Sequence, residues 1–199
     1  MSNGEQLPYP KILEDPKGPV EVRFMTAQDR DGVLAFAGAL PPHDLLFLPR
    51  DISQPKVLDA WIRENARDAL TTLLAVREGT VIGCVTIVRD PLSWSPHVAE
   101  LRAVLLPEAR GTGLGRKMVV EAFRLALSFG IEKITAHMTA DQAGAIAVFE
   151  TMGYRAEALL RDHVRDPEGK KHDIVILSHD VANFAARMAA YGLGEGTHN

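Results

Sequence analysis

A glycine-rich turn between a strand and a helix is the feature of this sequence that most restricts its fold. The predicted strand covers 98–106, the predicted helix covers 113–129, and the turn Arg110-Gly-Thr-Gly-Leu-Gly115 joins them. The first amides of a helix have no partner within it, and glycines allow the backbone to approach a bound anion closely. The turn therefore predicts an anion site, to which Arg116 and Lys117 add positive charge.

Two common nucleotide-binding loops do not match this turn. A P-loop ends in Gly-Lys-Ser/Thr, whereas Gly115 is followed by Arg116. A dinucleotide fingerprint reads Gly-x-Gly-x-x-Gly, whereas Gly111, Gly113 and Gly115 give Gly-x-Gly-x-Gly. The pattern that does match is Arg-x-x-Gly-x-Gly, starting at Arg110, and it resembles the pyrophosphate-binding motif of the GCN5-related N-acetyltransferase superfamily. A tight helix-start turn without a ligand is the alternative.

Hydrophobic periodicity divides the rest of the chain into strands and helices. We expect strands at 20–24, 71–76, 81–88, 98–106, 131–138, 154–164 and 171–178. We expect helices at 27–40, 55–67, 113–129, 143–152 and about 180–191. Hairpins dominate this order, but strand–helix–strand crossovers occur at 98–138 and 131–164, and a crossover implies locally parallel strands.

This order of elements predicts an α/β (α+β) fold. A mixed, mostly antiparallel sheet of about seven strands would carry helices on both faces. Residues 1–19 contain four prolines and are expected to form an extended arm. Residues 20–178 would form the domain, and residues 179–199 a C-terminal helix with a frayed tail. A chain of 199 residues suits one compact domain.

Composition excludes several classes of function. Hydrophobic residues make up 46% of the chain and charged residues 24%, as in ordinary folded proteins. The net charge of −4 argues against a non-specific nucleic-acid binder. No apolar run approaches the ~20 residues of a membrane span, and the N-terminus lacks the apolar core of a secretory leader. Cys84 is the only cysteine, which suits a reducing compartment such as the cytoplasm.

A second motif strengthens the resemblance. The segment Ala145-Ile-Ala-Val-Phe-Glu-Thr-Met-Gly-Tyr154 is similar to the superfamily's small helix that ends in Gly-aromatic, and the order of elements matches across about 20–178. The resemblance implies the GNAT fold, with a splayed central pair of parallel strands at 98–106 and 131–138. It also implies an N-acetyltransferase that holds its cosubstrate acetyl-CoA in that opening and needs no metal.

The resemblance also assigns a cosubstrate site. Pantetheine amides would pair with the strand backbone at 104–106, and the pyrophosphate would lie on the amides of 111–115. A strand-end N–H near Val104 would polarise the thioester carbonyl and stabilise the oxyanion of the tetrahedral intermediate. The residues expected to contact acetyl-CoA are Val104, Leu105, Leu106, Arg110, Gly111, Thr112, Gly113, Leu114, Gly115, Arg116, Gln142 and Phe149.

Glu100 is the candidate general base. Acylation needs a neutral amine, and a lysine amine has a pKa of about 10.4, so a proton acceptor helps at neutral pH. Glu100 lies on the strand 98–106 and shares a side of it with Arg102. In an enclosed cleft its pKa would be raised toward a useful range. The alternative is an exposed glutamate paired with Arg102.

The acceptor is expected to be a primary amine on a protein lysine. The reason is that the position of Glu100 is similar to that of a glutamate in bacterial protein-lysine acetyltransferases; a small-molecule amine is the alternative. Many family members carry Tyr where Phe149 stands and Asn where Gln142 stands. Phe149 has no proton for the departing thiolate, so a non-catalytic acyl-CoA-binding module is a second alternative.

The remaining chemically active residues have simpler interpretations. Cys84 and Tyr154 are expected to be buried packing residues. His163, His172 and His179 surround the last hairpin without a paired-ligand spacing, so no metal site is predicted. The arm and the C-terminal helix would either mediate a homodimer or cover a sheet edge.

Overall fold

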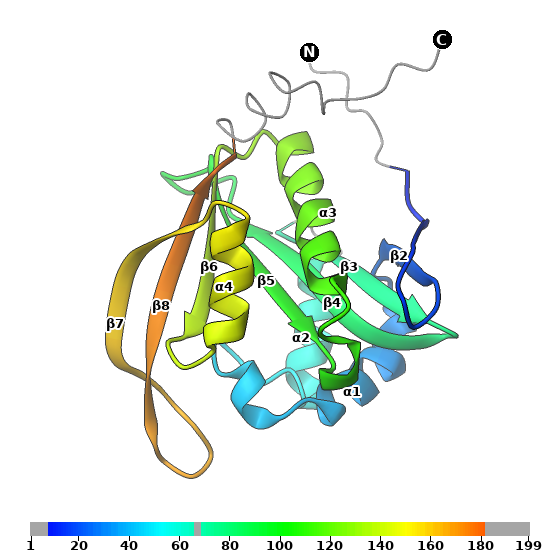
Figure 1. The fold of residues 1–199 in the computed structure, drawn as a ribbon, viewed down its shortest axis with the longest axis horizontal. Helices are drawn as coiled ribbons and strands as arrows, with labels where there is room; N and C mark the ends of the chain where they lie inside the picture. Colours follow the sequence, from blue (N-terminus) through cyan, green and yellow to red (C-terminus); the bar gives the residue numbers. More distant parts are fainter. Residues whose placement is uncertain (1–7, 66–68, 182–199) are drawn as a thin grey trace.

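One eight-stranded sheet forms the centre of the molecule, with helices on both of its faces (Figure 1). The computed structural model describes residues 8–65 and 69–181. Within them the strand order is β1-β2-β3-β4-β5-β6-β8-β7. Neighbouring strands are antiparallel except β5 and β6, which are parallel. The mixed, mostly antiparallel sheet expected from the sequence is confirmed.

The elements follow the predicted order closely. The strands are β1 Lys11–Leu13, β2 Val20–Phe24, β3 Leu70–Arg77, β4 Thr80–Arg89, β5 Val98–Leu105, β6 Lys133–Thr139, β7 Arg155–Arg165 and β8 Lys171–Asp180. The α-helices are α1 Arg30–Ala39, α2 Pro55–Asn65, α3 Leu114–Ser128 and α4 Ala143–Thr151. Short 3-10 helices are η1 Ala27–Asp29, η2 Pro42–Leu45 and η3 Pro107–Ala109.

The sheet is covered on both sides because its central strands are apolar on both faces. Most residues of β3 and β4 are buried. Helices α3 and α4 pack on one face, and α1 and α2 on the other (Figure 1). The side of α3 that packs on the sheet is buried at Leu114, Met118, Ala122 and Leu125. No helix among the described residues has both the length and the apolar character to cross a bilayer.

The sheet has one strand more than predicted, because part of the N-terminal arm joins it. Residues Lys11–Leu13 pair antiparallel with β2. On α3, the buried Glu121 accepts hydrogen bonds from the Tyr9 hydroxyl at 3.0 Å and from Lys11 Nζ at 2.7 Å. The N-terminal arm, which its prolines predicted to be extended, is therefore attached both to the edge of the sheet and to helix α3.

The two crossovers have different outcomes. The first, through α3, makes β5 and β6 parallel neighbours as predicted. The second, through α4, makes β7 parallel to β6, but β8 lies between them and pairs with both. The hairpin return strand thus takes the place beside β6. Strand β8 continues to Asp180, and the predicted helix at 180–191 lies almost entirely outside the described residues.

Candidate active site

Strands β5 and β6 separate soon after they start. They pair only through Val98–Glu100 and Lys133–Thr135, although β5 continues to Leu105 and β6 to Thr139. On its other side β5 stays paired with β4 as far as Leu105. Backbone groups need hydrogen-bond partners when they are buried. The edge of β5 that faces the opening can therefore pair with a bound molecule, as expected for pantetheine.

The glycine turn stands at the end of β5 and starts α3. Gly111 and Gly113 have φ of +76° and +86°, and Gly113 is the N-cap of α3. The first helical hydrogen bond runs from the Lys117 N–H to the Gly113 carbonyl at 3.2 Å. The amides of Gly115 and Arg116 precede that bond, so they are first-turn donors at the positive end of the helix dipole. This geometry suits a phosphate.

Glycine serves two purposes in this turn. A Cβ built on Gly111 or Gly113 would meet no atom within 4 Å, so the space beside the turn is open. A Cβ on Gly115 would lie 3.2 Å from Leu105 Cδ1, so this glycine permits close packing of α3 on β5. Leu114 between them is fully buried and anchors the turn in the core. The first two positions leave the anion site open, and the third fixes the helix.

Arg110 turns away from the amides of the glycine turn. Its Nη2 lies 2.6 Å from Asp44 Oδ2, and its guanidinium donates to the Leu105 carbonyl at 2.7 and 3.1 Å. The neighbouring Leu106 N–H donates to the Ile82 carbonyl of β4 at 2.9 Å. The Leu105 carbonyl and the Leu106 N–H, both in the segment expected to pair with pantetheine, therefore already have hydrogen-bond partners in the protein.

The other two cations of the turn differ in their surroundings. Lys117 Nζ donates to the Glu14 carbonyl of the arm. On the other side of the turn, Lys17 Nζ of the arm donates to the Glu108 carbonyl at 2.7 Å. Arg116 makes no ion pair with any residue in the described part of the chain. The arm thus contacts the turn from both sides.

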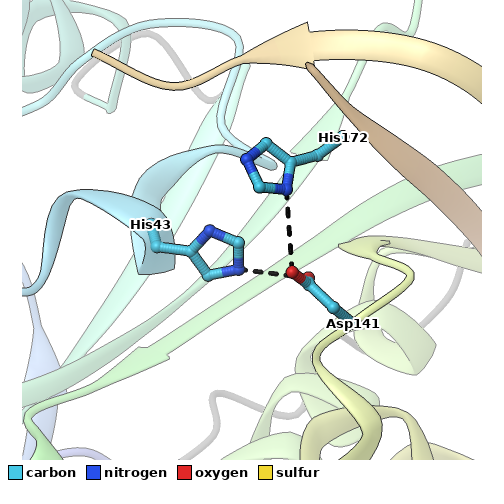
Figure 2. A group of neighbouring side chains, drawn as sticks. All are labelled: His43, Asp141 and His172. Carbon is cyan, nitrogen blue, oxygen red and sulfur yellow. Dashed lines mark hydrogen bonds and ion pairs between the residues drawn. The ribbon is translucent and has the colours of Figure 1, made fainter. Parts of the chain in front are cut away.

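Helix η2 connects the two sides of the opening. Asp44 pairs with Arg110 beyond β5, as described above, and the adjacent His43 contacts the end of β6. His43 Nε2 lies 3.1 Å from Asp141 Oδ1 and 3.3 Å from Thr139 Oγ1 (Figure 2). Two consecutive side chains therefore cross-link the ends of β5 and β6. Sequence reasoning left 44–50 without an assignment and did not predict this contact.

Glu100 stands where the two strands part. Both of its carboxylate oxygens accept from Arg102, at 2.8 Å from Nε and 2.9 Å from Nη2, and both side chains are about one-fifth exposed. The expected pairing of these neighbours is present. A base role requires one oxygen to exchange Arg102 for the amine.

A cavity of about 220 Å³ lies on the α2 face of the sheet, and its lining includes Val88, the β4 residue that pairs with Glu100. Arg102 and Val104, on the same side of β5 as Glu100, line it together with Thr86 and Val88 of β4. Most of the other lining side chains are apolar and come from α2, β3 and the segment before α2; the full lining is Leu48, Pro49, Arg50, Ile52, Val57, Trp61, Glu64, Leu70, Cys84, Thr86, Val88, Arg102 and Val104. The residues of α2 and of its preceding segment were not predicted as site residues.

Cys84 is a buried packing residue, as the sequence predicted. Cys84 lines the cavity but is 3% exposed, and burial raises the pKa of its thiol to about 12. It therefore stays neutral and is a poor nucleophile.

Phe149 and Tyr154 pack against each other beneath α4. Phe149 is 6% exposed, and its ring centroid lies 4.8 Å from that of Tyr154. The Tyr154 hydroxyl has no hydrogen-bond partner among the described residues, and burial raises the pKa of Tyr154 far above its usual value. Tyr154 is therefore poorly suited to protonate a thiolate, in agreement with a packing role.

Gln142 occupies the start of α4 beside the end of β6. Its N–H donates to the Thr139 carbonyl at 3.0 Å, and its own carbonyl accepts from the Ile146 N–H at 3.1 Å. It is the N-cap residue of α4. The backbone of Gln142 is thus held by hydrogen bonds, and its side chain belongs to the β6 side of the opening between β5 and β6.

Comparisons with known proteins agree with this architecture. Residues 39–154 match the model of the acetyltransferase (GNAT) family. A ribosomal-protein-alanine N-acetyltransferase from Brucella melitensis has a similar structure, with 22% identity, a TM-score of 0.68 and coverage of 80% of this chain and 98% of that one. A spermidine N-acetyltransferase from Vibrio cholerae, solved with CoA and spermine, has 15% identity, a TM-score of 0.70 and coverage of 83% and 98%.

A third similar structure carries the cosubstrate itself. It is the Salmonella typhimurium protein yncA with its cofactor acetyl-CoA, at 17% identity, a TM-score of 0.69 and coverage of 81% of this chain and 94% of that one. No curated protein matches the sequence.

The splayed strands and the glycine turn define a CoA-dependent acyltransferase. The chain belongs to the acetyltransferase (GNAT) family. It is an N-acetyltransferase, its cosubstrate is acetyl-CoA, and acetyl transfer in this family needs no metal.

Proposed function

We propose that this enzyme acetylates a small primary amine with an apolar body, bound in the cavity beside Glu100. The observation that carries the proposal is the lining of that cavity. Its surface is mostly apolar, and Glu64 is the only carboxylate among the described residues that line it. At about 220 Å³ it is smaller than the roughly 300–1,000 Å³ of drug-sized sites.

The charges around the cavity argue against a polyamine. Glu64 Oε1 lies 3.7 Å from Arg50 Nη1, and Glu100 is bound by Arg102. A polyamine carries several positive charges and needs several free carboxylates, because desolvating an unpaired charge is costly. A protein lysine, the acceptor first expected from the position of Glu100, would require an open groove rather than a small cavity beneath α2.

The reaction follows from the placement of the two substrates. The amine nitrogen attacks the thioester carbonyl carbon, the C–N bond forms, and the C–S bond breaks. Glu100 accepts the proton that the amine loses, and the CoA thiolate takes up a proton as it leaves. Amides along the open edge of β5 donate to the carbonyl oxygen as negative charge develops there. A thiolate is a good leaving group, so Phe149 in place of Tyr does not prevent turnover.

The acceptor class is tested by measuring thiol release from acetyl-CoA with three kinds of amine. These are a phenylalkyl amine, spermidine and a lysine-containing peptide. We expect the phenylalkyl amine to give the highest kcat/KM. A higher value for the peptide would establish protein acetylation instead. Measurable CoA binding without release for any amine would favour a binding module.

The base assignment is tested by Glu100→Gln. The variant keeps the shape of the side chain and loses the proton acceptor, so kcat at neutral pH should fall by about 10²–10⁴ while CoA affinity is unchanged. Glu64→Gln is the matched control, because Glu64 lines the same cavity but lies on α2. Unchanged turnover in Glu100→Gln, or an equal loss in Glu64→Gln, would contradict the assignment.

A further inference from the structure

Three side chains from distant parts of the chain converge beside η2. His43 comes from η2, Asp141 from the turn between β6 and α4, and His172 from β8. Both imidazoles point at the Asp141 carboxylate (Figure 2). His43 Nε2 lies 3.1 Å from Asp141 Oδ1, and His172 Nδ1 lies 3.6 Å from Asp141 Oδ2. All three donor atoms lie within 4.8 Å of one another.

A second carboxylate fixes the buried histidine. His172 Nε2 lies 2.8 Å from Asp166 Oδ2, and the His172 side chain is only 7% exposed. With Nε2 held by Asp166, Nδ1 is the nitrogen directed toward Asp141. A carboxylate on the far nitrogen is the arrangement that orients histidines which bind metals. The outer partner is therefore already in place.

We propose that His43, Asp141 and His172 bind a divalent transition-metal ion. Two imidazole nitrogens and one carboxylate oxygen form a donor set that suits ions such as Zn²⁺. Ligands at about 2.0–2.2 Å from a tetrahedral zinc lie roughly 3.3 Å apart. The observed separations of 3.1 Å to Oδ1 and 3.6 Å to Oδ2 of Asp141 are near that spacing, and all three donor atoms lie within 4.8 Å of one another, so rotations of the side chains would bring them onto one ion. Asp141 is about half exposed, which leaves water access for a fourth ligand.

The position of the site gives it a structural role. Acetyl transfer needs no metal, and the site lies beyond the end of β6, whereas Glu100 lies where β5 and β6 part. An ion bound there would join η2 to the β6–α4 turn and to β8. It would strengthen the link that His43 and Asp44 make across the opening. The proposal does not depend on the identity of the acceptor amine.

Zinc binding to the full chain tests the proposal. Calorimetry with ZnCl₂, on protein from which any histidine tag has been removed, should show one ion per chain. His43→Gln and Asp141→Asn, at partly exposed positions, should each weaken binding at least tenfold. Asp166→Asn should weaken it by about 10–100-fold through loss of the orienting contact. His163→Gln is the matched control, because His163 lies on the neighbouring strand with an exposed side chain.

The outcomes separate a metal site from a hydrogen-bonded cluster. Absence of zinc binding by the wild type would overturn the proposal, as would equal affinity in His43→Gln and Asp141→Asn. Cobalt substitution gives a second measurement, since visible absorption typical of tetrahedral Co²⁺ should be lost in the same variants. Thermal melts without metal check that each variant folds. The buried His172 can be replaced as well, by His172→Gln, but if that variant does not fold, the variants at the partly exposed His43 and Asp141 decide the result.

Discussion

Gly113 has a backbone conformation that other residues rarely adopt, and it faces open space. Its φ is +86°, and a Cβ there would have no neighbour within 4 Å. Glycine is therefore required by the local conformation and not by crowding within the chain. The open space beside it is where the pyrophosphate of acetyl-CoA is expected.

Gly113→Val should abolish CoA binding, because a branched side chain would fill that space. Gly169 is a matched control, since it has φ +88°, also has no atom within 4 Å of a built Cβ, and lies in the β7–β8 hairpin. Both variants should lose about 1–3 kcal/mol of stability from backbone strain. Calorimetric titration with CoA should show binding lost only in Gly113→Val. Retained affinity there would contradict the assignment of the turn.

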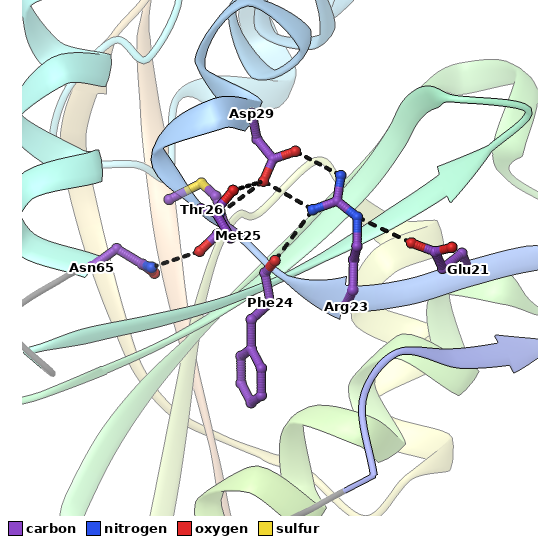
Figure 3. Close-up of polar contacts among 7 residues, drawn as sticks. All are labelled: Glu21, Arg23, Phe24, Met25, Thr26, Asp29 and Asn65. Carbon is purple, nitrogen blue, oxygen red and sulfur yellow. Dashed lines mark hydrogen bonds and ion pairs between the residues drawn. The ribbon is translucent and has the colours of Figure 1, made fainter.

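At the scale of elements, one carboxylate organises the junction of β2 with α1. Asp29 accepts from both Arg23 Nη1 and Nη2, at 2.9 and 2.6 Å, and from the Thr26 N–H and hydroxyl (Figure 3). Thr26 and Asp29 form a capping box at the start of η1. This explains why 27–29 forms a 3-10 turn before α1, where the sequence predicted one continuous helix. In the same view Asn65, the last residue of α2, donates to the Met25 carbonyl at 3.2 Å.

Asp29→Asn should destabilise the protein by about 1–3 kcal/mol at neutral pH. The hydrogen bonds from Arg23 hold the pKa of Asp29 below its ordinary value of 3.8. A carboxylate whose pKa is lower in the folded state than in the unfolded state stabilises the fold at a pH above its unfolded-state pKa. This stabilisation is lost as the pH falls through the folded-state pKa. The difference between wild type and variant in urea unfolding should therefore shrink below about pH 3.8.

The control for this experiment is Asp31→Asn. Asp31 also pairs with an arginine, Arg30, but its side chain is 93% exposed, and such pairs contribute little. A pH-independent difference for Asp29→Asn would show that the carboxylate charge is not the stabilising factor.

The N-terminal arm depends on a second buried carboxylate. Glu121 of α3 is 4% exposed and accepts hydrogen bonds from Tyr9 and Lys11 of the arm. Burial, together with the charge of Glu121, raises the pKa of Tyr9. Glu121→Ala leaves these donors unpaired and should cost about 2–3 kcal/mol in chemical denaturation. Arg124→Ala removes the half-exposed third partner and should cost less than about 1 kcal/mol. Equal costs would show that the arm does not depend on Glu121.

At the scale of the whole molecule, the two proposed substrate sites lie on different sides of the sheet. The glycine turn begins α3 on one face, and the cavity lies under α2 on the other. They can meet only where β5 and β6 part, because that is where the paired sheet between them ends. Glu100 stands at this point, the last residue of β5 that pairs with β6.

Val88→Phe should reduce the size of the acceptor cavity without affecting the cosubstrate. Val88 lines the cavity and stands opposite Glu100 on the neighbouring strand. We expect KM for the best small amine to rise at least about tenfold, with acetyl-CoA affinity unchanged. Val148→Phe, on the exposed side of α4, is the matched control. An unchanged KM in Val88→Phe would place the amine elsewhere.

Sequence patterns sufficed where the signal is local. The strand, glycine turn and helix at 98–129 were correctly predicted, since backbone conformation and periodicity fix them within a few residues. The extra strand β1 was missed, because Lys11–Leu13 is short, is flanked by prolines and becomes a strand only by pairing with β2. The place of β8 beside β6 was missed for the same reason: strand order depends on long-range pairing.

The sequence by itself determined the class of this protein. The turn Arg110–Gly115 predicted an anion site, because anion binding at a helix start needs only neighbouring residues. The acetyltransferase class followed from the resemblance of this turn and of the Gly-aromatic helix end to the GNAT superfamily, and the family match confirmed it. Tertiary structure alone decided what surrounds that site. The cavity beneath α2, the cross-link through His43 and Asp44, and the cluster with His172 all join residues far apart in the chain. Their chemistry exists only at folded distances, which no spacing in the sequence encodes.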